Sequence, residues 1–220
     1  MNTLREKFLQ KIAPELAKKL KLNDVHAVPY IEKIVVNVGL GEAIDNPQAL
    51  VKMGEDIAMI TGQRPIVTRA KKAISNFKLR PGIGIGLKAT LRGDRMWDFY
   101  EKLVSIVLPR VRDFRGLPRG AFDGCGNYSI GIREHTVFPE VEPNKIDKLR
   151  GVEIVIVTTA KDDKDGLLLL EKLGMPFARI AEERTIESMK QQMKKEKKEI
   201  AKIKAKRKEA SQIDVSEQEE

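Results

Sequence analysis

Hydrophobic residues recur at helical spacing in four separate stretches of the chain. Apolar positions three or four residues apart predict helices at about residues 3–20, 47–61, 94–108 and 162–173. Proline at the start of the second stretch and Gly62 directly after it are typical helix boundaries. The chain therefore contains several amphipathic helices, each of which needs a surface to bury its apolar side.

Strands are predicted where apolar and polar residues alternate, because successive side chains of a strand point to opposite faces. Such alternation runs over residues 30–38, 87–92 and 128–132. Residues 153–159 form a β-branched run typical of a central strand, and residues 64–69 form a shorter extended segment. Each strand lies between two helical stretches or directly beside another strand.

The order of these elements indicates an α+β fold. Helices and strands follow one another as α-β-α-β-β-α-β-β-α, which favours an antiparallel or mixed sheet with helices packed on one side. We expect a single domain in which one face of the sheet carries the core and the other face is free of helices. The alternation places these polar side chains on the free face: Lys33, Asn37, Lys88, Thr90 and Arg92.

The charge of the chain points to a polyanionic partner. Its net charge is +9 and its pI is about 9.5. A third of all residues are charged, yet residues 62–92 contain eight Lys or Arg residues and no Asp or Glu. A field of one sign over such a length attracts phosphate backbones. The pattern favours a nucleic-acid partner, with RNA as the better candidate.

Two features within this acid-free stretch allow more than one interpretation. The run Gly82–Gly86 leads into a strand rather than a helix, which argues against a dinucleotide-binding loop. It is either a plain turn or a loop whose backbone approaches RNA, flanked by Lys78, Arg80 and Lys88. Phe77 either stacks on a base or packs under its own loop.

Several classes of function are disfavoured. No stretch approaches the roughly 18 consecutive apolar residues of a membrane span, and the N-terminus does not resemble a signal peptide. The one cysteine, Cys125, cannot form an intramolecular disulfide and is expected to be unreactive. His26 and His135 show no metal-ligand spacing and are expected at the surface. We expect a soluble cytoplasmic protein that is not an enzyme and uses no cofactor.

Residues 180–220 differ in composition from the rest of the chain, so we treat them as an extension of a domain formed by residues 1–179. Lys190 to Lys208 is almost entirely Lys, Glu, Gln and Ala, and an acidic end follows. Apolar residues before and within this run fit a heptad only in part. Two interpretations stay open: a solvated, partly helical tail that orders on a partner, or a short coiled coil.

A series of short motifs is shared with one known family. They follow one another in order, at the family's spacing, over about residues 1–179, which makes the resemblance highly specific. The motifs are Glu32–Gly39, Thr61–Pro65, Thr68–Ile74, Leu87–Gly93, Asp113–Leu117, Phe122–Gly124, Gly126–Tyr128, Phe138–Glu140, Thr158–Ala160 and Pro176–Arg179. In these motifs the chain resembles the bacterial form of large-subunit ribosomal protein L5.

The resemblance implies a structural protein of the large ribosomal subunit. Members of the family bind 5S rRNA in the central protuberance, beside 23S rRNA and other large-subunit proteins, through one sheet face and adjoining loops. The 5S rRNA contacts implied by position are Asn37, Gln63 and Thr90, with basic support from Lys33, Arg69, Lys88 and Arg92.

Two further contacts are implied by the same resemblance. The loop at about residues 71–84 is similar to the family's extension toward the elbow of P-site tRNA. Residues 131–141 are similar to the surface that faces small-subunit protein S13 in an intersubunit bridge. The residues carried over are Lys71, Lys72, Asn76, Phe77, Lys78, Arg80 and Gly82 for tRNA, and Arg133, Glu134, His135 and Val137 for the bridge.

The extension inherits no role from the resemblance, because typical family members stop near Arg179. We expect its lysines to add rRNA contacts or to touch a neighbouring protein, and unchanged subunit assembly after truncation at Arg179 would contradict this. The alternative to the ribosomal function is a nonspecific RNA chaperone or an extraribosomal RNA-binding regulator. A coiled-coil interaction protein is a third, weaker possibility.

Overall fold

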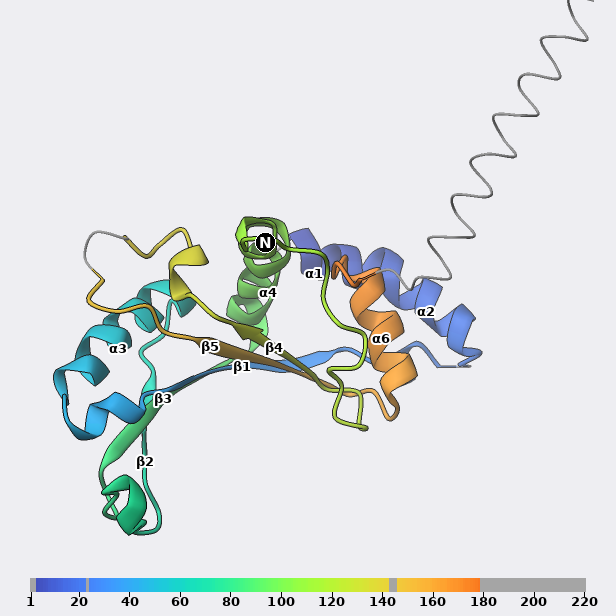
Figure 1. Cartoon of the computed structure of the whole chain (residues 1–220). Helices are drawn as coiled ribbons and strands as arrows, with labels where there is room; N and C mark the ends of the chain where they lie inside the picture. Colours follow the sequence, from blue (N-terminus) through green and yellow to red (C-terminus); the bar gives the residue numbers. More distant parts are fainter. Residues whose placement is uncertain (1–2, 23, 143–145, 179–220) are drawn as a thin grey trace, which may run out of the picture. The chain divides into compact units, whose positions relative to one another are not determined.

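Five strands form one antiparallel sheet (Figure 1). β1 (Ile31–Gly39) lies at the centre, between β3 (Gly84–Leu91) and β5 (Val152–Thr158). β2 (Ile66–Arg69) pairs with β3 at one edge, and β4 (Tyr128–Ile132) pairs with β5 at the other. All four pairings are antiparallel, so the predicted α+β class is confirmed and the sheet is not mixed.

The computed structural model describes residues 3–22, 24–142 and 146–178. The chain divides into two compact units, Met1–Phe177 and Ala178–Glu220. Only Ala178 of the second unit is described, so the expectations for the C-terminal extension lie outside the described residues.

The α-helices cover one face of the sheet and leave the other face bare (Figure 1). They occupy the four predicted stretches, although two of these stretches contain a π-helical turn that periodicity does not reveal. Their bounds are α1 (Thr3–Lys7), a π turn (Phe8–Ile12), α2 (Ala13–Leu20), α3 (Gln48–Thr61), α4 (Gly93–Lys102), a π turn (Leu103–Val107), α5 (Leu108–Arg110) and α6 (Asp163–Lys172). Short 3₁₀ turns lie at Val25–Ala27, Gly41–Ile44, Ser75–Phe77 and His135–Val137.

The core fills the layer between the helices and the sheet. Ile34, Val36 and Val38 of β1 are at most 1% exposed, as their alternation predicts. The register of β1 against β5 shifts between Ile31 and Lys33. This irregularity lets Ile31 and Ile34 both face the core while Lys33 points to the bare face.

Two buried tyrosines differ in how their hydroxyl groups are satisfied. Tyr100 of α4 is completely buried, and its hydroxyl has no hydrogen-bond partner among the described residues. Tyr128 of β4 donates its hydroxyl to the backbone oxygen of Pro118 at 2.6 Å. Burial raises the pKa of both phenols, that of Tyr128 to about 12. The Tyr100 hydroxyl thus loses water without gaining a protein partner.

We expect Tyr100→Phe to raise the free energy of unfolding by about 1 kcal/mol, because it removes a buried polar group that makes no hydrogen bond. Tyr128→Phe is the matched control and should lower it by about 1 kcal/mol. Urea denaturation of the three proteins measures both changes. Equal destabilisation by the two substitutions would show that the Tyr100 hydroxyl is satisfied.

Candidate RNA-binding surface

A row of polar side chains crosses three strands on the bare face of the sheet. Lys88 of β3 pairs with Asn37 of β1, and Asn37 pairs with Glu153 of β5. The side-chain amide of Asn37 donates to Oε2 of Glu153 at 3.1 Å. The row combines a cation, an amide and a carboxylate, which suits hydrogen bonding to RNA sugars and base edges as well as to phosphates.

Two cations at the other end of this face share one carboxylate. Nη1 of Arg92 lies 3.1 Å from Oε1 of Glu32, and Nζ of Lys33 lies 3.6 Å from the same oxygen. These side chains are partly exposed, so the ion pairs contribute little to stability. The contact orients both cations without preventing a phosphate from replacing Glu32. Between the two groups lies Thr90, which pairs with Val35.

Five of the seven residues expected to bind 5S rRNA therefore lie on or at the end of the bare face, and two do not. Gln63 lies in the turn between α3 and β2, where its backbone oxygen accepts a hydrogen bond from the Thr61 hydroxyl at 2.9 Å. Arg69 donates from Nη1 to the backbone oxygen of Gly82 at 2.9 Å. Arg69 thus braces the base of the loop between β2 and β3.

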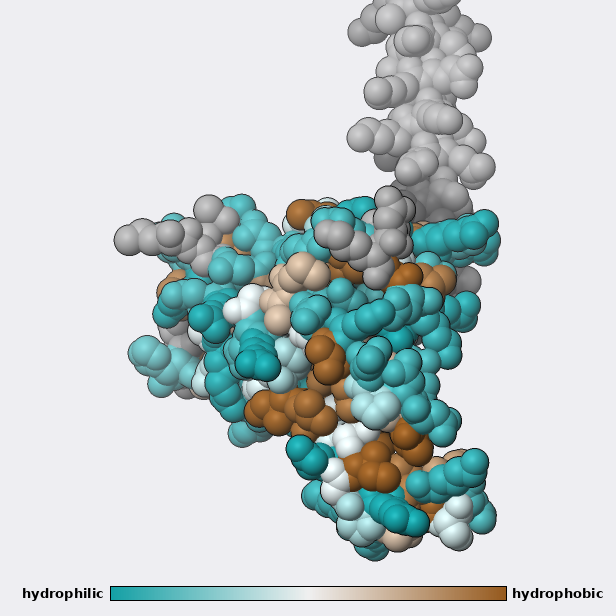
Figure 2. Space-filling model, turned by 90° about the vertical axis from the view of Figure 1, so that its left-hand side faces the viewer, coloured by the Kyte–Doolittle hydropathy of each residue, from teal (hydrophilic) through white to brown (hydrophobic). Residues whose placement is uncertain are grey.

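The loop between β2 and β3 projects away from the sheet at its β2 edge (Figures 1 and 2). Every residue from Lys71 to Lys78 is exposed, as is Arg80. Lys71, Lys72, Lys78 and Arg80 make no ion pair with another described residue. We call residues 70–83 the basic hairpin tip; its cations are available to a partner.

The exposure of Phe77 decides between the two interpretations of this residue that the sequence left open. Its side chain is 66% exposed, so the interpretation that Phe77 packs under its own loop is wrong. Figure 2 shows apolar surface gathered at the base of the projecting hairpin. Within the loop itself, Ile74 is a second exposed apolar side chain.

The glycine run has a structural explanation. Gly86 lies within β3, where a Cβ atom would sit 2.7 Å from the Val38 backbone oxygen and 2.8 Å from Oγ1 of Thr68. Gly82 has a φ of +90°, a conformation that side chains disfavour. The run continues into β3 and not into a helix, which excludes the dinucleotide-binding geometry. Strand packing and one turn therefore account for these glycines.

His135 is not a surface residue, and that expectation was wrong; His26 is exposed, as expected. The backbone N–H of His135 donates to the Arg150 oxygen at 3.0 Å, and the Arg150 N–H donates to Nδ1 of His135 at 3.2 Å. Nε2 lies 3.6 Å from Oδ2 of Asp56 in α3. Because its partners are distant in sequence, no local pattern reveals this burial. The neighbouring Arg133 and Glu134 are exposed, and Val137 is half-buried.

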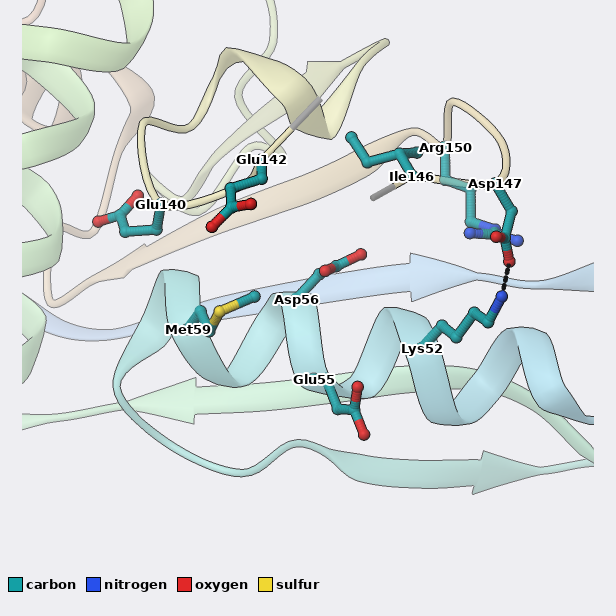
Figure 3. Close-up of a pocket in the computed structure, with 9 residues that line it drawn as sticks. All are labelled: Lys52, Glu55, Asp56, Met59, Glu140, Glu142, Ile146, Asp147 and Arg150. Atoms are coloured by element: carbon teal, nitrogen blue, oxygen red, sulfur yellow. Dashed lines mark hydrogen bonds and ion pairs between the residues drawn. The ribbon is translucent and has the colours of Figure 1, made fainter. Parts of the chain in front are cut away.

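A cavity of about 240 Å³ lies next to this buried histidine, between α3 and the segment that precedes β5 (Figure 3). Burial raises the pKa of the Asp56 carboxyl in its wall. Lys52 spans the cavity mouth to Asp147 at 2.6 Å, and Arg150 donates from Nε to Oε1 of Glu42 at 2.6 Å. The Lys52–Asp147 pair thus joins α3 to the segment before β5, and the Arg150–Glu42 pair joins that segment to the turn Gly41–Ile44. The lining residues are Lys52, Glu55, Asp56, Met59, Glu140, Glu142, Ile146, Asp147 and Arg150.

The described residues contain no cluster of three or more side chains that could hold a metal ion. Within the same part of the chain, no helix is long and apolar enough to cross a bilayer. Cys125 is exposed.

Comparison with known proteins identifies the family. The family model described as "Ribosomal protein L5" matches residues 24–80, and a second model, which describes the C-terminus of the same ribosomal family, matches residues 84–177. A "Large ribosomal subunit protein uL5" of Symbiobacterium thermophilum is 55% identical over 178 residues, 81% of this chain and 99% of that protein. The chain belongs to the ribosomal protein L5 family. The resemblance noted from its motifs is confirmed.

Other L5 relatives match to a similar extent. The protein of the same name from Roseiflexus sp. (strain RS-1) is 56% identical over 174 residues, 79% of this chain and 97% of the relative. That from Thermoanaerobacter sp. (strain X514) is 52% identical over 179 residues, 81% of this chain and the whole relative. The L5 family is structural and non-enzymatic, which confirms that this chain is not an enzyme. Residues beyond the matched part have no counterpart in these relatives.

Glu153 is a candidate site residue that sequence reasoning missed. It begins a β-branched run, so periodicity assigned it only to a strand. Its position beside Asn37 depends on the register of β5 against β1, which no local pattern encodes. The only signal in the sequence is its charge at the start of an otherwise apolar strand.

The Glu42 ion pairs predict a pH dependence of stability. Hydrogen bonds from Lys148 and then Arg150 hold the pKa of Glu42 below its ordinary value of 4.5. A lowered folded-state pKa contributes stability above the unfolded pKa, and this contribution is lost as the pH falls through the folded value. We expect the difference in unfolding free energy between the unmodified chain and Glu42→Gln to shrink below about pH 4.5. Denaturation at pH 7 and at pH 3.5 measures it; a constant difference would contradict the assignment.

Proposed function

We propose that this protein binds 5S rRNA through the bare face of its sheet and so helps to build the central protuberance of the large ribosomal subunit. The row Lys88–Asn37–Glu153, on a face without helices in an L5-family protein, carries the proposal. Its amide and carboxylate suit RNA sugars and bases, while the cations suit phosphates. In this function the chain works within the cytoplasmic ribosome, beside 23S rRNA and other large-subunit proteins.

Hydrogen bonds on this face supply selectivity, and electrostatics supplies much of the affinity. Charge alone attracts any RNA, because phosphates are common to all sequences. Asn37 and Thr90 instead present neutral groups at fixed positions in two adjacent strands. An RNA whose shape brings its 2′-hydroxyls or base edges to those positions gains contacts that other RNAs do not make.

We expect Asn37→Ala and Thr90→Ala each to weaken 5S rRNA binding by about 1–3 kcal/mol, because an RNA group desolvated in the complex loses its partner. Ser129→Ala is the matched control: Ser129 is exposed on the edge strand β4 of the same face. Titration of 5S rRNA and of a length-matched scrambled RNA, at about 150 mM salt, measures affinity and preference. Equal binding to both RNAs would instead support a nonspecific RNA chaperone.

The basic hairpin tip is the proposed contact to P-site tRNA. Its cations, the exposed Phe77 and the exposed Asn76 and Gly82 can meet a backbone without reading a sequence, so that every tRNA is accepted. The proposed bridge to small-subunit protein S13 uses the exposed Arg133 and Glu134 with Val137. His135 supports that segment from inside and does not touch the partner.

Reversing the charges of Lys78 and Arg80 to Glu should slow translation by assembled ribosomes and leave 5S rRNA affinity within about twofold, because phosphate contacts act locally under salt screening. Lys161→Glu with Lys164→Glu is the control at the opposite end of the sheet, near α6. Translation rate and 5S rRNA affinity of both double variants are the two measurements. A large loss of 5S rRNA affinity in the hairpin variant would contradict the division of roles.

A further inference from the structure

One edge of the sheet is only partly covered. At β4 the Ser129 N–H donates outward to the Ala121 oxygen at 3.1 Å, and the Asp123 N–H donates to the Asn127 oxygen at 3.2 Å. Alternate residues of a strand point their backbone groups the same way. The N–H and C=O groups of Gly131 therefore also point away from β5, and no described backbone group beyond the sheet pairs with them.

A groove of about 530 Å³ runs along this uncovered edge, between β4 and residues 111–117. Its walls are largely apolar, with Val111, Phe114, Leu117, Ile130 and Ile132 among the lining residues.

Charged side chains surround the mouth of the groove. The guanidinium groups of Arg112, Arg115 and Arg133 are exposed, and none forms an ion pair with another described residue. Asp113 and Glu134 are the two acids of the lining, so cations are in excess. Asp113 has a φ of +56°, an uncommon conformation that turns the segment back beside the strand.

We propose that this groove binds an extended peptide of a partner protein, which adds as a strand to the outer edge of β4. An added strand pairs with the outward N–H and C=O groups of Gly131. Every second side chain of such a peptide faces the apolar wall, and the side chains between them face the arginines. The partner segment accordingly alternates apolar and acidic residues.

A peptide fits these features better than RNA does. The free edge presents a backbone donor and a backbone acceptor on one residue, a pattern that another strand complements and a phosphate backbone does not. The apolar wall would contact no part of a phosphate chain. The inference goes beyond the proposed function: it concerns a site on the edge of the sheet, not on its RNA face, and shares only Arg133, Glu134 and Val137 with the proposed bridge.

Gly131 allows a direct test. Its φ is not in the positive range, and a Cβ added there meets no atom within 4 Å. Gly131→Pro removes the outward N–H but no bond to β5, as edge strands tolerate. Gly131→Ala keeps the N–H and is the matched control. The probe is an eight-residue peptide that alternates valine and glutamate, titrated into the full chain and both variants.

We expect Gly131→Pro to weaken binding of the acidic peptide at least about fivefold, because one hydrogen bond is lost. The affinity of Gly131→Ala should stay within about twofold of that of the unmodified chain. A peptide with lysine in place of glutamate should bind at least about tenfold more weakly than the acidic one. Circular dichroism and urea denaturation establish that each variant is folded.

Three results would overturn the inference: equal binding by the proline variant, equal binding of the lysine peptide, or displacement of the acidic peptide by a short single-stranded RNA. The peptide result and the 5S rRNA result are read separately, because the peptide test depends on the outward backbone N–H of Gly131 and the 5S rRNA test depends on the side chains of Asn37 and Thr90. Conversely, loss of 5S rRNA preference would leave the peptide result standing.

Discussion

The alternation of side chains along β1 is the constraint on which both surfaces of the sheet depend. Ile34, Val36 and Val38 fill the core, while Lys33 and Asn37 point to the bare face. Because the period of a strand is two residues, a slip of one position would exchange these sets. Burial of the apolar set, at about 25 cal/mol per Å² of apolar surface, holds the polar set in place. The hydrophobic core thereby positions the residues proposed to contact RNA.

Because the helices cover only one face of the sheet, the side chains of the other face are available to a binding partner. Val35, Val155 and Val157 lie half-buried among polar neighbours, so they give the bare face a partly apolar floor. Lys88, Asn37 and Glu153 stand at one end of this floor, Lys33 and Arg92 stand at the other, and Thr90 lies between them. An extended surface of this kind suits a folded RNA more than a small ligand, which needs a concave pocket.

Sequence reasoning recovered what is local and missed what depends on register or distant packing. Helical stripes and strand alternation carry their own periods, so residues such as Met53 and Ile130 could be assigned to the core. The pairing of Asn37 with Glu153 and the burial of His135 against Arg150 join residues far apart in sequence. When the hydrogen-bond partner of a polar residue is distant in sequence, a single sequence does not show whether that residue is buried or exposed. The exposure of Phe77 likewise depended on how its loop packs.

The carboxylates of Glu32 and Glu153 give the bare face an internal counter-charge. In the chain without RNA, Glu32 forms ion pairs with Arg92 and Lys33, and Glu153 accepts a hydrogen bond from Asn37. A passing polyanion must displace a covalently tethered competitor whose local concentration cannot be diluted. Only a ligand that supplies several contacts at once recovers that cost. The chain therefore has two kinds of polar surface. The cations of the basic hairpin tip are open to any phosphate, whereas on the bare face Glu32 and Glu153 must be displaced by an RNA whose shape fits.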